Sequence, residues 1–304
     1  MHHHTHGAGK VLTWSTAATL IFVAVETAAG FWAHSLALLS DAGHNFTDAL
    51  ALVLAAVALR YQSKPPDEKK TYGYQRAGVL AALFNAFTLV VIALFIFWEA
   101  WERLMAPEAV HDTVMLVVAL LGVVLNGAIM MSLHRGRSDL NIRAAYVHML
   151  GDAVGAVGIV AGSILIHFTG WLRVDPILSI LIGAMIVWTA WDIIHEALNV
   201  LLEGLPRGMN LQSITGALQG VPGVVDVHDL HIWSLGSNAH ALSCHVLIED
   251  MPPSASNDIL KRINEVLCGH EIHHTTVQFE HVRCALSDTP CMIQPGGHAH
   301  EHGH

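Results

Sequence analysis

Six long apolar segments constrain the fold of this chain more than any other feature. They cover residues 11–32, 36–59, 78–101, 113–133, 144–168 and 176–202. Each is near the length of about 20 residues with which an α-helix crosses a bilayer. Charged residues make up only 13% of the chain, against about 25% in an average soluble domain. We therefore predict an α-helical membrane protein with six transmembrane helices over residues 11–205.

The distribution of basic residues between the loops predicts how these helices are oriented. Only Arg103 and Arg173 lie in the loops after the third and fifth segments, whereas ten Lys and Arg residues lie on the opposite side. Lys and Arg accumulate on the cytoplasmic side of membrane proteins. Both termini are therefore expected in the cytoplasm, together with a His-rich N-terminal tail over residues 1–10.

A short pattern occurs twice inside the apolar segments. His44 and Asp48 lie four residues apart in the second segment, and His148 and Asp152 repeat this spacing in the fifth. Residues four apart share one face of a helix. Two such helices facing each other would offer two nitrogen and two oxygen ligands, a set that suits tetrahedral zinc. Two carboxylates also balance the charge of one divalent cation.

A simpler interpretation is that each His packs in the interior and each Asp caps a helix. In a soluble protein that interpretation would be preferred. Within a membrane, ionisable side chains are costly and usually belong to functional sites. The repeat on two separate helices therefore indicates a metal site. Other polar residues in the spans are expected to form hydrogen bonds between helices or to lie near helix ends, among them Glu26, Asn85, Asn126 and Asp192.

The fifth segment also contains four glycines with the spacing of close helix packing. Gly151, Gly155, Gly158 and Gly162 form two overlapping sets in which small residues lie four apart. Small residues allow helix backbones to approach closely in lipid. We expect these glycines to bring the fifth helix, and with it His148 and Asp152, close to its neighbours.

The composition becomes that of a soluble domain after the sixth segment. A helix is predicted over residues 210–219 and two strands over 224–235 and 239–249, joined by a turn at 236–238. A second helix over 255–267 and a third strand over 275–282 follow. The order αββαβ predicts a small two-layer, ferredoxin-like α+β domain over residues 206–286. A flexible His-rich tail is expected over residues 287–304.

Metal-binding residue types gather in this second domain. The candidates are His228, His245, Glu280, His281 and Cys284, with further histidines nearby. All four cysteines lie in this last part of the chain, which is expected in the cytoplasm, where thiols stay reduced. We therefore interpret them as free thiols or metal ligands and not as a disulfide framework. A second, cytoplasmic metal site is expected, although the pattern does not decide which residues form it.

Three sequence stretches together resemble the cation diffusion facilitator family, most closely its bacterial zinc exporters, which are similar to the animal zinc transporters. They are residues 35–44 with Asp48, the pair His148 and Asp152, and residues 227–235. The resemblance covers nearly the whole chain. It implies an integral protein of the bacterial inner membrane, a cytoplasmic metallochaperone-like domain, a homodimer, and zinc export coupled to protons.

The family's transport site corresponds to His44, Asp48, His148 and Asp152, and its cytoplasmic site to His228, His245 and, less closely, Glu280. Zn²⁺ would be the substrate and also a structural or regulatory ion, while Cd, Co and Ni stay open as further substrates. Some members bind another metal in the loop after the second helix. Here that loop has tyrosine at the position of the histidine, in the run Tyr72-Gly73-Tyr74, so we expect that loop site to be missing.

Two other classes of function compete with transport. One is an intramembrane metal-dependent enzyme, which would need an open coordination position and a general base beside the ion. The other is a membrane metal sensor that uses the cytoplasmic cluster. The overall charge of −10 gives no indication of nucleic-acid binding. Metal ions, protons and the lipid bilayer are therefore the expected partners.

Overall fold

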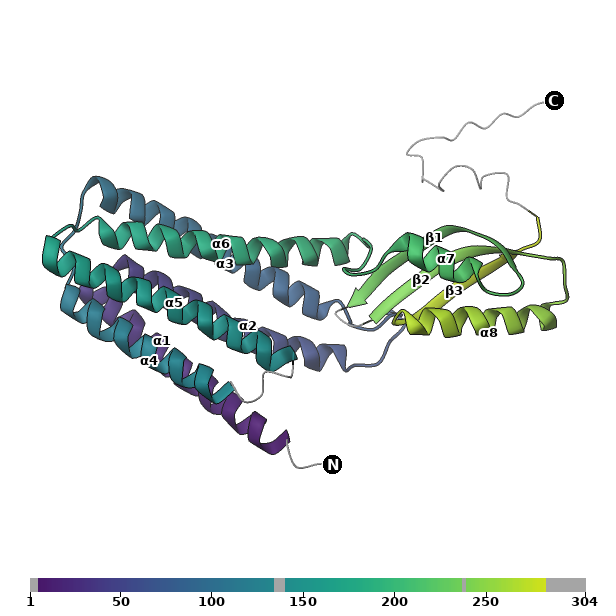
Figure 1. Ribbon diagram of the computed structural model, residues 1–304, viewed down its shortest axis with the longest axis horizontal. Helices are drawn as coiled ribbons and strands as arrows, with labels where there is room; N and C mark the ends of the chain where they lie inside the picture. The colour runs from purple at the N-terminus through teal and green to yellow at the C-terminus, as the bar shows by residue number, and fades with distance from the viewer. Residues whose placement is uncertain (1–4, 134–139, 237–238, 283–304) are drawn as a thin grey trace, which may run out of the picture. The chain divides into compact units, whose positions relative to one another are not determined.

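The computed structural model describes residues 5–133, 140–236 and 239–282 (Figure 1). Its first part consists of six long helices, as predicted: α1 (Thr5–Ala33), α2 (Leu36–Gln62), α3 (Ala77–Met105), α4 (Asp112–Leu133), α5 (Leu140–Thr169) and α6 (Val174–Leu201). The helices α2 to α6 are long and apolar enough to cross a membrane, and α1 contributes a shorter apolar stretch, Ala18–Ala33. Helix α1 begins at Thr5, within the region expected as a tail.

The helices bury one apolar face and expose another, as lipid contact requires. In the most apolar window of each candidate span only 28–33% of the residues are buried. The buried side chains form one cluster that draws on all six helices and includes Leu38, Leu89 and Ile159. The remaining apolar side chains face outward, so these helices are apolar on all sides, as membrane spans are.

Close helix contacts hold this bundle together. Helix α4 packs against both α1 and α5. A Cβ atom placed on Gly183 of α6 would lie 2.8 Å from the ring of Phe97 on α3, and one on Gly162 of α5 would lie 2.2 Å from Leu178 on α6. The expected close packing of α5 is therefore present at Gly162. Gly151 and Gly158 have no such neighbour within 4 Å, so the glycine pattern predicted more contacts than the structure has.

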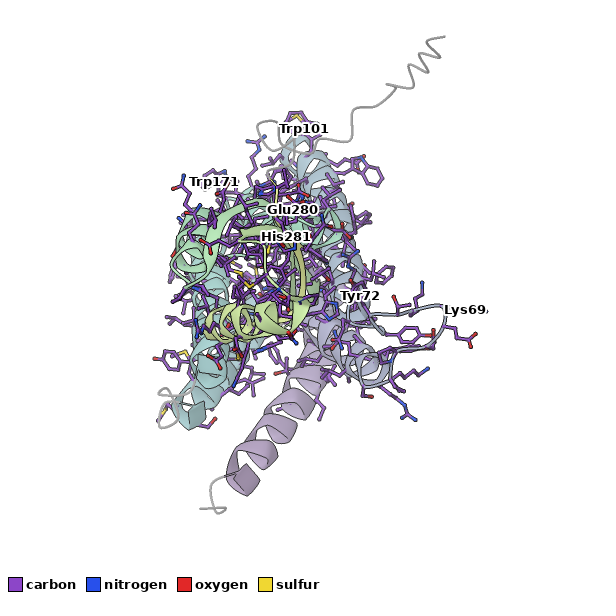
Figure 2. The ribbon with its side chains drawn as sticks, turned by 90° about the vertical axis from the view of Figure 1, so that its right-hand side faces the viewer. Lys69, Tyr72, Trp101, Trp171, Glu280 and His281 are labelled. Atoms are coloured by element: carbon purple, nitrogen blue, oxygen red, sulfur yellow. The ribbon has the colours of Figure 1, made fainter. Side chains whose placement is uncertain are left out.

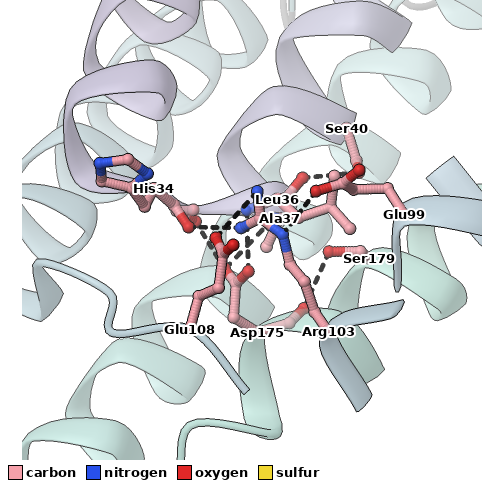
Figure 3. A network of polar contacts seen from close by, with 10 residues as sticks. His34, Leu36, Ala37, Ser40, Glu99, Arg103, Glu108, Asp175 and Ser179 are labelled. Carbon is pink, nitrogen blue, oxygen red and sulfur yellow. Dashed lines mark hydrogen bonds and ion pairs between the residues drawn. The ribbon is translucent and has the colours of Figure 1, made fainter. Parts of the chain in front are cut away.

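A buried carboxylate connects the start of α2 to the start of α6 (Figure 3). Asp175 accepts hydrogen bonds from the Ser35 hydroxyl at 2.6 Å and from the backbone N–H groups of Leu36 and Ala37 at 2.8 and 3.2 Å. These N–H groups belong to the first turn of α2, which has no partners for them within the helix. Beside it, Arg103 of α3 donates to the carbonyl oxygen of His34 at 2.6 Å. The end of the bundle that carries the α1–α2 turn is thus held by hydrogen bonds.

The C-terminal domain has the predicted order of elements: α7 (Leu211–Gln219), β1 (Val224–Gly236), β2 (Ala239–Ile248), α8 (Pro253–Gly269) and β3 (Ile272–Glu280). Asn210 caps α7 by accepting from the backbone N–H of Ser213, and Gly220 ends the helix. The sheet order is β1-β2-β3, with β1 antiparallel and β3 parallel to β2. The parallel pair follows from the crossover through α8.

Both helices of this domain contribute to one apolar core with the sheet. Ile214 and Leu218 of α7 and Ile259, Ile263 and Leu267 of α8 are buried in the same cluster as Leu242 and Val246 of β2. This arrangement confirms the predicted two-layer α+β domain. Residues 60–79, which join α2 to α3, belong to the same compact unit. Within this unit the Tyr72 ring lies 5.2 Å from the His274 ring, edge to face.

Candidate metal centres

Helices α2 and α5 bring the two sequence repeats together in one place. His44 and Asp48 lie one turn apart on α2, with 3.7 Å between His44 Nε2 and Asp48 Oδ2. His148 and Asp152 lie one turn apart on α5, with 3.7 Å between His148 Nε2 and Asp152 Oδ2. The helical period alone explains both pairs, because positions i and i+4 are neighbours on a helix surface.

Contacts between the helices close these pairs into a ring. His148 Nε2 lies 3.2 Å from Asp48 Oδ2, and His44 Nε2 lies 3.8 Å from Asp152 Oδ1. Ligand atoms around tetrahedral zinc are separated by about 3.3 Å, given bonds of about 2.0 Å. The distances between opposite members of the ring are longer. No three of the four side chains have ligand atoms that all lie within 4.8 Å of one another. The ring would therefore have to contract slightly around an ion.

Three polar atoms of this ring make no hydrogen bond of regular geometry, although the two carboxylate oxygens among them lie 3.2–3.7 Å from a histidine Nε2. They are His44 Nδ1, Asp48 Oδ2 and Asp152 Oδ2, and all three are buried. Buried polar atoms are normally paired, so unpaired ones require an explanation such as a bound ion. Two carboxylate groups and two imidazoles that share these contacts form a donor set that a divalent transition metal satisfies.

The ring is accessible from one side only. The side chains of His44 and Asp152 are 9% and 3% exposed, whereas those of Asp48 and His148 are 30% and 43% exposed. Asp48 lies nearer the end of α2 at Gln62, and His148 lies nearer the start of α5 at Leu140. The open side therefore faces the bundle end at which α2 finishes and α5 begins.

A second group of buried polar residues lies beside the ring on α1 and α2. Asn45 donates to Glu26 Oε2 at 3.5 Å, which agrees with the expected bonding of Glu26 between helices. A Cβ atom on Gly155 of α5 would lie 3.8 Å from Asp41 Oδ1. Asn85, in contrast, has an amide oxygen that is buried without a partner. Glu26, Asp41 and Asn45 thus lie beside the ring without joining it.

The C-terminal domain holds a tighter cluster. His228 on β1 and His245 on β2 are directly paired across the two strands, and Glu280 ends β3, which lies next to β2. His228 Nε2 lies 3.2 Å from Glu280 Oε2, and His245 Nδ1 lies 3.1 Å from Glu280 Oε1. Within the described residues these form the only group of three metal-binding side chains with ligand atoms mutually within 4.8 Å.

Asp229 belongs to this cluster, although sequence reasoning missed it. The strand pairing is irregular between His228 and His231, and Asp229 has a positive φ of 50°. This bulge places its carboxylate 3.7 Å from His245 Nε2 and 3.0 Å from His231 Nε2. An alternating strand would have sent Asp229 to the face opposite His228. The adjacent His-Asp pair was the available signal, but a bulge cannot be located from spacing.

The remaining candidates do not join a cluster in the described residues. His281 is exposed and follows the end of β3, and Cys284 lies outside the described residues. Cys244 and Cys268 are free thiols, as expected, with Cys244 buried and Cys268 exposed. Burial raises the pKa of the Cys244 thiol to about 11, so this side chain stays protonated and serves as part of the core.

Both parts of the chain match described protein families. Residues 12–202 match the family "Cation efflux transmembrane domain", and residues 206–282 match "Cation efflux protein, cytoplasmic domain". These two ranges coincide with the helical bundle and with the α+β domain. The main difference from the two compact units is residues 60–79, which fall in the first match but group with the C-terminal domain.

Three relatives illustrate the similarity of the whole chain. The "Metal cation efflux system protein CzcD" of Cupriavidus metallidurans is 39% identical over 94% of this chain and 91% of its own. The "Zinc transporter ZitB" of Pectobacterium atrosepticum is 38% identical over 98% and 93%. A Bacillus subtilis protein named "Cadmium, cobalt and zinc/H(+)-K(+) antiporter" is 38% identical over 97% and 96%.

Proposed function

The chain belongs to the cation efflux family of membrane transporters, and we propose that it exports Zn²⁺ from the cytoplasm in exchange for protons. Membership of this family makes it a transporter and not an enzyme. The names of the relatives support zinc as the substrate, with cadmium and cobalt as further candidates. The name of the Bacillus relative also supports coupling to protons.

The observation that carries this proposal is the ring formed by His44, Asp48, His148 and Asp152. Each imidazole Nε2 contacts both carboxylates, at 3.2–3.8 Å. The four side chains come from two helices that cross the membrane, so the ion would lie on a path through the bilayer. Two ionised carboxylates and one divalent cation are together neutral, which lowers the cost of holding the ion at this depth.

The exposure of the ligands indicates the direction of loading. The more accessible pair, Asp48 and His148, faces the bundle end with the loops that follow α2 and precede α5. Those loops are rich in Lys and Arg, which assigns them and both termini to the cytoplasm. In this proposal the described conformation is the one that loads zinc from the cytoplasm. Transport by alternating access requires a second conformation in which His44 and Asp152 become the accessible pair.

Proton exchange follows from the ligand chemistry. Imidazole must be neutral and carboxylate ionised to bind the metal, so protons and Zn²⁺ compete for the same lone pairs. Zinc entering from the cytoplasm would displace protons, and protons arriving on the outer side would displace zinc. The sequence repeats supply these groups on two separate helices, so a relative movement of α2 and α5 would change the affinity for both.

The cluster of His228, His245 and Glu280 would hold a second, regulatory Zn²⁺ in the cytoplasmic domain. His228 Nδ1 is buried without a hydrogen-bond partner, and the 3.2 Å contact between His228 Nε2 and Glu280 Oε2 is not a hydrogen bond of regular geometry; both observations support these groups as ligands of an ion. His281 and Cys284 stay candidates for this site. A homodimer in the bacterial inner membrane is the expected assembly, given the family of the cytoplasmic domain. A metal sensor would use the same cluster but would move no zinc.

The test is zinc flux into proteoliposomes containing the purified protein under an imposed pH gradient. We expect flux with the wild type and its loss, by at least about tenfold, with Asp48→Asn or Asp152→Asn, because each change removes one ligand and one negative charge. Asp112→Asn is the matched control, since Asp112 lies in a span but contacts His167 instead of the ring. Wild-type flux in both ring variants would exclude this transport site, and no flux in the wild type would favour a sensor.

A further inference from the structure

The segment from Arg60 to Arg76 has a composition unlike the rest of the chain. It holds five basic residues against two acidic ones, an excess of three positive charges, whereas the whole chain carries −10. It also contains three of the four tyrosines of the protein. The basic residues are Arg60, Lys64, Lys69, Lys70 and Arg76, and the tyrosines are Tyr61, Tyr72 and Tyr74. Charge and aromatic rings are thus concentrated in one short segment, called here the basic loop.

The basic loop lies at the membrane surface because of its connections. It begins in the last turn of α2 and ends immediately before α3 starts at Ala77, and both helices are candidate spans. Its residues can therefore be only a few positions away from the lipid headgroups. Tyrosine is enriched at this depth, where its ring contacts apolar chains and its hydroxyl contacts water.

Hydrogen bonds within the loop fix its conformation. Asp67 Oδ1 accepts from the backbone N–H groups of Lys69 and Lys70 at 2.8 and 2.7 Å, and Asp67 Oδ2 accepts from the Tyr74 hydroxyl at 2.8 Å. The hydrogen bond from Tyr74 is the main cause that holds the pKa of the Asp67 carboxyl below its ordinary value. Gln62 donates to the carbonyl oxygen of Gln75 at 2.9 Å and joins the two ends of the loop.

This conformation engages the Asp67 carboxylate in hydrogen bonds within the loop and leaves the two neighbouring lysines exposed. Lys69 and Lys70 are exposed, and Figure 2 shows Lys69 at the free end of the loop. The Lys64 ammonium lies 4.3 Å from the centre of the Tyr61 ring and 5.8 Å from that of Tyr74. Among the described residues, Arg76 forms an ion pair with Glu203, whereas Arg60, Lys69 and Lys70 form no ion pair. These three cations are available to an external anion.

We propose that the basic loop binds the phosphate groups of anionic phospholipids at the membrane surface. Lys69 and Lys70 would contact the phosphates, while Lys64, positioned by the two tyrosine rings, would add a third cation near the bilayer. Basic residues beside a span attract anionic lipids by about 1 kcal/mol each, which is about fivefold per residue. Because Tyr72 of the same loop contacts His274 of β3, a bound lipid would also anchor the C-terminal domain to the bilayer.

The experiment compares anionic and zwitterionic lipid association with the full-length protein. The purified protein is placed in mixed phosphatidylglycerol and phosphatidylcholine, with a fluorescent label on one lipid at a time. The association of each lipid is measured by energy transfer from the protein's tryptophans to the label. The test variant is Lys69→Gln with Lys70→Gln. The matched control is Lys261→Gln with Arg262→Gln, which removes an equally exposed adjacent basic pair from α8, a helix that does not adjoin a membrane span.

We expect the loop variant to lower the preference for phosphatidylglycerol at least about fivefold and the α8 variant to leave it unchanged. Equal preferences in the wild type and the loop variant would overturn the proposal, as would an equal loss in the two variants. Inorganic phosphate is the second probe, compared with chloride at matched ionic strength. Displacement of the lipid by phosphate alone would identify a site for soluble phosphate and would also overturn the lipid assignment. Zinc flux is not needed for any of these results.

Discussion

His44 is the proposed transmembrane ligand at which metal selectivity can be tested most directly. Its imidazole is almost fully buried between Asp48 and Asp152. His44→Asp replaces one nitrogen donor by a third carboxylate, and ligand type and geometry determine metal selectivity. We expect the ratio of Cd²⁺ to Zn²⁺ flux to rise on the order of tenfold, equivalent to about 1.4 kcal/mol of differential binding.

The measurement is flux of each metal into proteoliposomes at equal ion concentrations. His167→Asp is the control, because this histidine lies on the same helix as His148 but pairs with Asp112. A flux ratio that does not change in the His44 variant would mean that a different element selects the metal.

At the scale of residues, the sequence predicted those contacts that depend on local spacing. His44 with Asp48 and His148 with Asp152 follow from the helical period, and the structure brings all four together. Asp229 and Asp175 were not predicted. The first depends on a bulge, and the second contacts a turn 140 positions away in the sequence. Neither type of contact has a periodic signal, so only the folded chain reveals it.

Helix α2 depends at its first turn on the buried carboxylate of Asp175. Asp175→Asn would present an amide N–H₂ group to donors and weaken three hydrogen bonds to the Ser35–Ala37 turn. A hydrogen bond to a charged group contributes about 1.5–3 kcal/mol. A loss of about 2 kcal/mol would lower the midpoint of thermal unfolding by about 4–8 °C, and we expect zinc flux to fall because α2 carries half of the ring.

Thermal unfolding of the purified protein in detergent checks this expectation. Ser179→Ala is the control, since the Ser179 hydroxyl donates to the backbone carbonyl of Asp175 at 2.8 Å, a hydrogen bond within α6. A midpoint in Asp175→Asn that equals the wild-type value would show that water or a neighbouring donor replaces the carboxylate.

Helix α5 offers two glycines that differ only in what surrounds them. A Cβ atom at Gly162 would lie 2.2 Å from Leu178 and 3.2 Å from Val174, whereas one at Gly158 meets nothing within 4 Å. Gly162→Ala should therefore cost about 1–3 kcal/mol through overpacking. Gly158→Ala should stabilise by up to about 1 kcal/mol, because alanine favours helix more than glycine. The measurement is the midpoint of thermal unfolding of each variant. If both midpoints shift in the same direction, the described packing of α5 on α6 is wrong.

At the scale of elements, hydropathy predicted the number and order of the helices but not their ends. The apolar run 78–101 became α3 over Ala77–Met105, because Glu102 and Arg103 continue the helix beyond the apolar region. Arg103 remains helical since it pairs with Glu99 at 2.9 Å, one turn earlier. The glycine pattern likewise identified a packed helix but not which of its glycines meet a neighbour, since that depends on the side chains of α6.

At the scale of the molecule, two compact units each carry one candidate metal centre. In the bundle, the contacts of the ring are long, at 3.2–3.8 Å, and the ring is open on one side. Both features suit a site that must release its ion. The C-terminal cluster is tighter and draws its ligands from three adjacent strands. A rigid sheet suits a site that retains its ion, because the strand register fixes the ligand positions. We therefore propose that the first centre carries the transported ion and that the second holds a regulatory ion.

The proposed proton exchange involves the whole transporter and is tested on the complete protein. A protonated imidazole has no free lone pair for a metal. Acid on the outer side should therefore help to remove zinc from the outward-facing site, and acid on the cytoplasmic side should hinder loading. Export should speed up as the outside becomes more acidic than the cytoplasm, until protonation of the ring blocks the next cycle. The measurement is a pH-dye signal inside proteoliposomes during zinc flux, with the membrane potential clamped and the Asp152→Asn variant as the control. Zinc movement without opposing proton movement would exclude antiport, although the ring could still be the transport site.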